Sequence, residues 1–412
     1  MATYESYKDS GVKWLGEIPS HWEMKKLRAF FTEVTEVNSA TEIHNQLQFK
    51  YGTIISKPDT EIDSDVLKTI AKYTIVRPGD IIINGLNLNY DFISFRVGKV
   101  NELGVITSAY ISMRPNPDLS AKFYEYLLKA MDAKKVFHGF GTGIRATLSF
   151  KELKHKPIPL VPLAEQEAIV AYLDKVTAEI DCAIEAQQKM IEALNERKQI
   201  IITRAVTRGM DRWETYPLRF VFELRGGYTP SKNDQSLWEN GTIPWYRMED
   251  IRKSGRFLNE SIQKVNAKAV KSKGTFKAGS YIMAICTASI GEHAMLIADS
   301  LANQQFMNLK VHKSLISRFN PLFLFYYFFV IGQFCRDNAN STCFQYVDMA
   351  ALKRYPIPIP RKEEQDEIVE YIETNTSALN NAIKAANKRL ELLQERKQII
   401  INEVVTGKKK VI

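Results

Sequence analysis

The sequence predicts an α/β protein with two mixed α+β domains that are two copies of one design, separated by two long antiparallel helices forming a coiled coil. Three observations predict this fold class. The heptapeptide ERKQIII occurs at 196–202 and again at 395–401, an offset of 199 residues. The stretches 163–207 and 362–406 that contain these copies hold no Pro or Gly. The segments that precede them also repeat, so the whole chain has an internal pseudo-twofold repeat.

Both long stretches carry apolar residues at heptad spacing, which is typical of a helix that packs along one stripe. At 1.5 Å rise per residue each helix is about 65 Å long, and its stripe requires a partner. A coiled coil that only joins two chains fits one such stretch equally well. Gln187, Asn375 and Arg389 are polar seam residues and candidates for fixing register. The expected apolar seam comprises Ile169, Leu173, Val176, Ile180, Ala183, Met190, Leu194, Ile201, Ile368, Ile372, Leu379, Ala382, Ala386, Leu393 and Ile400.

The globular segments repeat in their strand and turn patterns. WEMKKLRAFF at Trp22 corresponds to WETYPLRFVF at Trp213, and IVRPGDIIIN at Ile75 corresponds to TFKAGSYIMA at Thr275. Each segment ends in a proline run that predicts an extended approach to the long helix. We therefore expect a first α/β domain at 1–160, a first long helix at 161–210, a second domain at 211–359 and a second long helix at 360–412.

The charge is unevenly distributed along the chain. Its 56 Lys and Arg against 47 Asp and Glu give a net charge of +9. Each long stretch carries −3, so the remainder carries +15. A basic surface on the globular parts is expected if those parts face phosphates, and it suggests a polyanionic partner.

Cysteine usage and hydropathy indicate the compartment. Cys182, Cys286, Cys335 and Cys343 form no CxxC pair, which argues against a structural zinc site or a disulfide framework. Free thiols without a signal peptide predict a cytoplasmic protein. The most apolar run, 322–331, is shorter than the roughly 20 residues that a membrane span needs, and we interpret it as a buried helix.

Motifs for catalysis are weak. GFGTG at 139–143 lacks the strand before it and the helix after it that a nucleotide loop requires, and no P-loop occurs. PDTE at 58–61 resembles half of a nuclease carboxylate cluster, but no Glu/Asp-x-Lys follows at a useful spacing, and a turn explains it better. No nucleophile and base arrangement stands out. The sequence therefore predicts a binding protein without catalysis of its own and without a metal site.

Polar residues suited to nucleic acid occur where the two copies differ in sequence. Asn, Gln and Arg can pair with base edges, whereas others can hold phosphate or stack. For any one of them alone, a solvated or structural role is the more common one. Together they predict DNA binding, because they fall in the basic part of the chain. The candidates are Asn84, Asn87, Asn89, Tyr90, Arg96, Arg145, Tyr228, Ser231, Lys232, Arg247, Gln304 and Gln305.

The chain resembles the DNA-specificity subunit of a type I restriction-modification enzyme. The matching stretches run in order over nearly the full length, and their helix, proline run and second copy agree. They are YKDSGVKWLGEIPSHWE at Tyr7, GTGIRATLSFKELKHKPIPLVPLAEQEAIVAYLD at Gly141, ERKQIIITRAVTRG at Glu196, GGYTPSKNDQSLWENGTIPWYRMEDI at Gly226 and YPIPIPRKEEQDEIVEYI at Tyr355.

The resemblance implies that the two domains are target-recognition domains that each read one half of a bipartite, asymmetric DNA sequence. It implies that the long helices are conserved spacer regions that bind two methyltransferase subunits, and that two restriction/translocase subunits join them. S-adenosylmethionine, ATP and Mg²⁺ would then belong to these partners, as would DNA methylation and cleavage. No membrane is implied. The family's base contacts are not transferable, because the reading loops differ between members.

Two other hypotheses fit part of the sequence. A stand-alone nuclease or methyltransferase would need catalytic motifs that we do not find. A structural coiled-coil protein with basic domains would bind DNA with strong salt dependence but no dependence on sequence.

Overall fold

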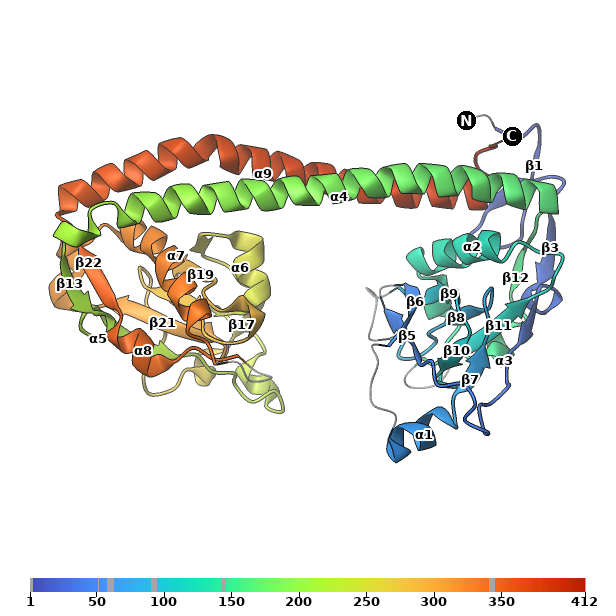
Figure 1. Cartoon of the computed structure of the whole chain (residues 1–412), viewed down its shortest axis with the longest axis horizontal. Helices are drawn as coiled ribbons and strands as arrows, with labels where there is room; N and C mark the ends of the chain where they lie inside the picture. Colours follow the sequence, from blue (N-terminus) through green and yellow to red (C-terminus); the bar gives the residue numbers. More distant parts are fainter. Residues whose placement is uncertain are drawn as a thin grey trace. The chain divides into compact units, whose positions relative to one another are not determined.

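The computed structural model describes residues 3–50, 52–57, 63–89, 95–141, 146–340 and 345–411. The chain forms two compact units, residues 1–188 with 388–412 and residues 189–387. Each unit combines one α/β domain with a part of α4 (Leu163–Thr207) and a part of α9 (Lys362–Val405), drawn in green and red in Figure 1. Helix α4 fills the stretch 163–207 that holds no Pro or Gly, and α9 ends one residue before the end of the matching stretch 362–406.

The domain of the first unit is built on a four-stranded antiparallel sheet in the order β4-β11-β8-β9. Helix α2 lies between this sheet and α4, and the three share one apolar core (Figure 1). The elements are β1 (Tyr7–Asp9), β2 (Glu17–Pro19), β3 (Glu23–Lys26), β4 (Phe31–Glu33), β5 (Leu47–Lys50), β6 (Thr53–Ser56), α1 (Ser64–Ile70), β7 (Thr74–Val76), β8 (Ile81–Ile83), β9 (Val97–Lys99), β10 (Gly104–Ile106), β11 (Ile111–Pro115), α2 (Ala121–Ala133), α3 (Phe150–Leu153) and β12 (Pro157–Leu160).

The second unit has the same design, with the sheet order β14-β21-β18-β19-β16 and helix α7 in the place of α2. Helix α7 contains the apolar run 322–331 and is buried as predicted. No described helix is both long and apolar enough to cross a bilayer. The elements are β13 (Glu214–Pro217), α5 (Leu218–Val221), β14 (Phe222–Gly226), β15 (Ile243–Tyr246), α6 (Met248–Ser254), β16 (Phe257–Leu258), β17 (Gln263–Val265), β18 (Tyr281–Ala284), β19 (His293–Leu296), β20 (Leu301–Ala302), β21 (Phe306–Val311), α7 (Pro321–Asp337), α8 (Met349–Arg354) and β22 (Pro356–Ile359).

The predicted repeat is confirmed strand by strand. β4, β11, β8 and β9 correspond to β14, β21, β18 and β19 in both order and antiparallel pairing. The two proline runs form β12 and β22, which pair with β3 and β13 in two-stranded sheets. In a two-stranded sheet each strand has a neighbour on one side only, so a proline whose missing N–H would face the open side costs no hydrogen bond between strands.

A buried glutamine joins the domain to the long helix in each unit. The Gln166 amide donates to Val161 O at 2.7 Å and accepts from Ser120 N at 2.9 Å. The Gln365 amide donates to Pro360 O at 2.9 Å and accepts from Asn320 N at 2.8 Å. These residues are 199 positions apart and both are fully buried, so each satisfies backbone groups that burial would otherwise leave unpaired.

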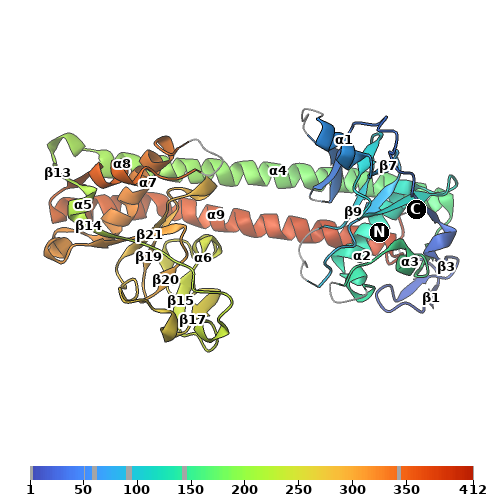
Figure 2. The same ribbon diagram turned by 90° about the horizontal axis from the view of Figure 1, so that it is seen from below.

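The long helices run beside each other in opposite directions within each unit, as Figures 1 and 2 both show. In the first unit Lys397 Nζ of α9 lies 2.6 Å from Asp181 Oδ2 of α4. In the second unit, Ile202 and Val206 of α4 and Ile372 of α9 belong to the same apolar core. The predicted antiparallel pairing is therefore present in both.

Four of the predicted seam residues are exposed, and in α9 one of the two seam positions in each heptad is displaced by one residue. Ile372, Ala386 and Ile400 are buried as expected, but the exposed residues include Met190, Asn375, Ala382 and Arg389. The buried or half-buried partners in α9 are instead Val369, Thr376, Ile383 and Leu390, and Thr177 occupies the matching place in α4. Thr177 Oγ1 and Thr376 Oγ1 donate to the carbonyls of Leu173 and Ile372, so a polar residue fits the apolar stripe.

The roles proposed for the polar seam residues change accordingly. Asn375 and Arg389 are exposed and cannot fix register, and the Asn375 amide donates to Tyr371 O of its own helix. Gln187 is buried and keeps that candidate role. The other predicted seam residues are buried or half-buried, namely Ile169, Leu173, Val176, Ile180, Ala183, Leu194, Ile201, Ile368, Leu379 and Leu393.

Both long helices end in a left-handed glycine that packs against a tryptophan. Gly209 (φ 99°) follows α4 beside Trp213, and Gly407 (φ 72°) follows α9 beside Trp22. A Cβ at Gly407 would collide with Pro19, so glycine is required there for packing as well as for backbone conformation. The C-terminal end of the chain thereby becomes part of the first unit, where Trp22 is fully buried.

Candidate nucleic-acid interface

One loop has the same backbone design in both units. After β8, Leu148 N donates to Gly85 O and Leu88 N donates to Ala146 O, at 2.9 and 3.2 Å. After β18, Val347 N donates to Ile285 O and Thr287 N donates to Gln345 O, at 3.0 and 2.8 Å.

The tip of each loop is left-handed at a residue other than glycine. Asn87 has φ 53° and Thr287, 200 positions later, has φ 63°. Such residues cost free energy and tend to persist at functional sites, where the surrounding structure fixes them. We refer to residues 84–89 and 284–289 as the tip loops.

Three of the predicted first-unit residues lie in this tip loop. Asn87 and Asn89 are exposed. Asn84 is half-buried, and its Oδ1 accepts from Leu86 N at 3.1 Å, so its side chain shapes the loop. Two further candidates, Tyr90 and Arg145, lie outside the described residues. The exposed amides of Asn87 and Asn89 are therefore the described candidates for base contacts here.

The prediction that Arg96 contacts DNA is wrong. Its side chain is 1% exposed, and Nη1 donates to Asn84 O at 3.0 Å and to Leu86 O at 2.8 Å. Its backbone N–H donates to Asp132 Oδ2 at 2.7 Å. Burial raises the pKa of Asp132, and the hydrogen bond from Arg96 N opposes that effect. Arg96 therefore positions the tip loop through the backbone carbonyls of Asn84 and Leu86. A guanidinium has enough N–H donors to hold both.

In the second unit, two loops at one edge are hydrogen-bonded to each other. Tyr228 N donates to Ala302 O at 2.8 Å, and Thr229 Oγ1 donates to Gln304 Oε1 at 2.6 Å. The segments 227–232 and 303–305 are thus brought together. Ser231, Lys232 and Gln304 are exposed on them.

The remaining second-unit candidates are held by the protein. Tyr228 OH donates to Ala269 O at 2.7 Å, so this phenol is structural and not a free stacking platform. Gln305 Oε1 accepts from Asn303 Nδ2 at 3.2 Å. Arg247 precedes α6, and its Nη2 lies 2.8 Å from Glu249 Oε2. These three residues shape the edge. Ser231 and Lys232 are exposed, and Gln304, whose Oε1 accepts from Thr229, keeps its Nε2 available to a ligand.

A cationic loop beside this edge was not singled out by sequence reasoning. Lys271 Nζ lies 4.3 Å from the centre of the Tyr228 ring, and Lys268, Lys271 and Lys273 are exposed. Residues 251–300 hold eight Lys and Arg against three acidic residues. This excess of positive charge is visible in the sequence and could have predicted the cationic loop. Exposed lysines beside amides match the usual division between phosphate contacts and base contacts.

The family model described as "Type I restriction modification DNA specificity domain" matches this chain twice, at residues 19–193 and 210–391. The two matches together span more than half of the sequence. The chain belongs to this family. The resemblance seen in the sequence is confirmed, as is the prediction of a non-catalytic, DNA-specificity protein with two α/β recognition domains.

Relatives of this type I specificity protein match it in part or in full. It is 45% identical over 147 residues to the Type I restriction enzyme EcoprrI specificity subunit of Escherichia coli, a match that spans 36% of each chain. It is 23% identical to the putative MjaX specificity subunit of Methanocaldococcus jannaschii over 98% of this chain and 97% of that one.

A solved structure shares the fold of this specificity protein. It is described as "Structural basis underlying complex assembly and conformational transition of the type I R-M system", and it superimposes with a TM-score of 0.61 at 13% identity. The superposition covers 94% of this chain and 98% of that chain.

Proposed function

We propose that this chain is the DNA-recognition subunit of a type I restriction-modification complex, in which each unit reads one half of a bipartite, asymmetric DNA target. One observation carries the proposal, namely the same tip loop on the same sheet in both units with different side chains. Asn87 and Asn89 are exposed after β8, whereas at the matching positions of the second copy Thr287 is half-buried and Ser289 is buried. Equal scaffolds with unequal side chains would read two different half-sites.

The exposed chemistry supports this division of labour. Asn87, Asn89 and Gln304 carry amides, which can pair bidentately with adenine in the major groove. Lys232 and Lys271 supply charge for phosphates, which positions a protein on DNA without reading sequence. Family membership favours DNA over other polyanions as the partner.

The long helices suit a different partner. Each carries a net charge of −3, and exposed apolar residues on them include Met190, Ile200, Leu392 and Ile399. Acidic surface avoids DNA, and apolar surface that is exposed on a helix is suited to another protein. We assign these helices to the binding of two methyltransferase subunits, to which two restriction/translocase subunits join. S-adenosylmethionine, ATP and Mg²⁺ then belong to those partners, and this chain catalyses nothing itself.

A footprint of the chain on DNA, alone and with its methyltransferase partners, tests the proposal. Two short protected half-sites with an unread spacer are expected. A single contiguous site would contradict it, as would affinity that random duplex competes away without any preference for sequence. Cutting or methylation by the chain alone with Mg²⁺ and methyl donor would revive the stand-alone enzyme.

The spacer gives an independent test. Inserting four residues near Glu192 adds about one turn, roughly 6 Å, to α4. If the helices set the distance between the half-sites, the spacer between methylated adenines changes and both half-sites stay the same. If the spacer stays the same, the helices do not set the distance between the half-sites.

A further inference from the structure

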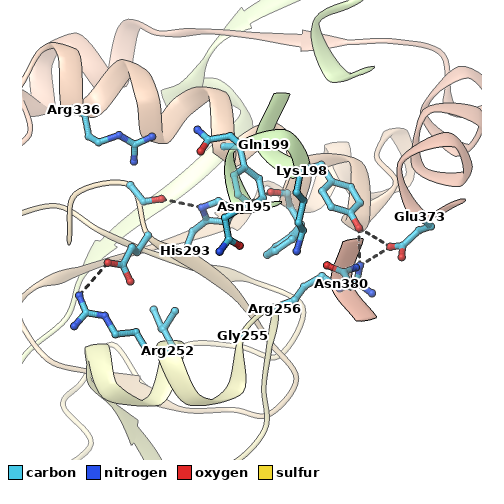
Figure 3. Close-up of a pocket in the computed structure, with 16 residues that line it drawn as sticks. Asn195, Lys198, Gln199, Arg252, Gly255, Arg256, His293, Arg336, Glu373 and Asn380 are labelled. Carbon is cyan, nitrogen blue, oxygen red and sulfur yellow. Dashed lines mark hydrogen bonds and ion pairs between the residues drawn. The ribbon is translucent and has the colours of Figure 1, made fainter. Parts of the chain in front are cut away.

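The second unit contains a cavity of about 690 Å³ between the long helices and the domain. Its walls come from α4, α6, α7, β19 and α9, and Figure 3 shows its polar residues. Phe325 and Phe329 of α7 form an apolar side. Four cations and two carboxylates line it, namely Lys198, Arg252, Arg256, Arg336, Glu292 and Glu373.

The carboxylates are already engaged. Arg256 Nη1 lies 2.5 Å from Glu373 Oε1, which also accepts from Tyr326 OH at 2.7 Å. Burial acts to raise the pKa of Glu373, but the hydrogen bonds from Tyr326 and Arg256 hold it below its usual value. Arg252 Nη2 lies 3.2 Å from Glu292 Oε1. Both carboxylates are therefore paired with an arginine, and Lys198 and Arg336 add two further positive charges to the cavity lining.

Among the described residues that line the cavity, Lys198 is the cation whose side chain forms no hydrogen bond or ion pair. It is half-buried, and Figure 3 shows its side chain extending toward Arg256. Within the described part of the chain, Lys198, Gln199 and Asn380 make no hydrogen bond or ion pair through their side chains. Burial and the charge of Arg256 lower the pKa of Lys198, and the charge of Glu373 opposes them only in part, so the ammonium gains from an anion that enters.

In the first unit, the lysine equivalent to Lys198 is paired with a carboxylate. Lys397 is 199 positions after Lys198, and its Nζ lies 2.7 and 2.6 Å from the two carboxylate oxygens of Asp181. The residue 199 positions after Asp181 is Asn380. The second unit thus keeps the lysine, as Lys198, but has the amide of Asn380 where the first unit has the carboxylate of Asp181. An amide can donate a hydrogen bond to an anion.

We propose that this cavity binds a phosphate group, held by Lys198 with Arg256 and by the amides of Gln199 and Asn380. Lysine is a point charge with three donors, and amide and guanidinium donors complete the shell that phosphate oxygens require. The phosphate is supplied by the backbone of bound DNA or by a free nucleotide, for which Phe325 and Phe329 provide an apolar wall. The DNA source rests on the proposed function, whereas the free source does not.

Two variants remove the site without touching the tip loops. Asn380→Asp restores the ion pair of the first unit, and Lys198→Met removes the charge but keeps the apolar stem. Asn375→Asp is the control, because it adds the same charge to an exposed position five residues earlier in α9. All three are measured as the full chain with its partners.

Calorimetric titration with inorganic phosphate and with AMP tests the free source. Both variants are expected to bind about tenfold more weakly than the wild type and the control. For the DNA source, the slope of log affinity against log salt is expected to shrink by about 0.9 in both variants, with the preferred sequence unchanged.

Either result, reproduced in both variants and absent from the control, supports the site and identifies its source. If neither variant changes the affinity for phosphate, the affinity for AMP or the slope of DNA affinity against salt, the site is refuted. If the wild type binds DNA without any preference for sequence, the proposed function is refuted instead, so the two failures are distinguishable.

Discussion

The two units agree where a polar group is buried at the helix–domain junction and differ where a side chain meets solvent or a ligand. Gln166 and Gln365 make the same two kinds of hydrogen bond to equivalent backbone groups. Nearby, Asp174 is held by Tyr126 and Lys122, whereas Glu373 is held by Tyr326 and Arg256. A buried backbone group has few alternatives for a partner, but an accessible charge can be paired from any neighbouring element.

The buried glutamines offer the strongest test of this equivalence. Replacing Gln166 by Ala leaves a buried N–H and one carbonyl unsatisfied, at a cost of about 3 kcal/mol in the free energy of unfolding. Replacing Gln365 by Ala leaves a buried N–H and the carbonyls of Pro360 and Arg318 unsatisfied, so its cost is at least as large. Urea unfolding followed separately on peptides of each unit by hydrogen exchange gives that free energy. Gln188→Ala, at an exposed position of α4, is the control and is expected to change it by less than about 0.5 kcal/mol. A smaller loss at Gln365 than at Gln166 would break the equivalence.

A pH titration should separate the two units by a smaller amount. His293 of β19 pairs with Met283, whereas Val97 holds the matching place opposite Ile83 in β9. Burial lowers the pKa of His293 to about 4, although its nitrogens lie 2.9 and 3.1 Å from the carbonyls of Gly291 and Phe325.

The folded state therefore binds fewer protons than the unfolded state between pH 4 and 6.5. Stability of the second unit is complete above pH 6.5 and falls by about 2 kcal/mol as the pH drops toward 4. Hydrogen exchange of α2 and α7 peptides across this range measures the difference. His293→Val should abolish the pH effect that is specific to α7, and its persistence would exclude His293 as the cause.

The left-handed tips predict the smallest effect. Thr287→Gly should stabilise the second unit by about 1 kcal/mol, because a β-branched residue is strained at φ 63°. Asn87→Gly should be nearly neutral, since asparagine tolerates this conformation. Thermal unfolding measures both. Equal shifts would mean that strain is not confined to the threonine.

The sequence was sufficient for the repeat, the helices and the family, because those depend on periodicity and on spacing that a single chain displays twice. It missed Thr177 and Thr376 as seam residues, because their side chains are polar although their hydroxyls donate to carbonyls of their own helices. It also placed Arg96 and Tyr228 among ligand contacts, although both are held by backbone carbonyls. Which donor finds an internal acceptor depends on tertiary proximity, and residue type does not reveal it. The exchange of Asp181 for Asn380 was visible in the aligned copies, but the cavity that gives it meaning was not.

Mapping of methylated adenines in cells tests most directly whether each unit reads its own half-site. The double variant Lys232→Ala, Gln304→Ala alters exposed residues of the second unit alone. With its partners present, it is expected to relax or change one half of the methylated sequence and to leave the other half and the spacer unchanged. A change in both halves, or in the half that responds to Asn87→Ala and Asn89→Ala, would contradict the claim that each unit reads its own half-site.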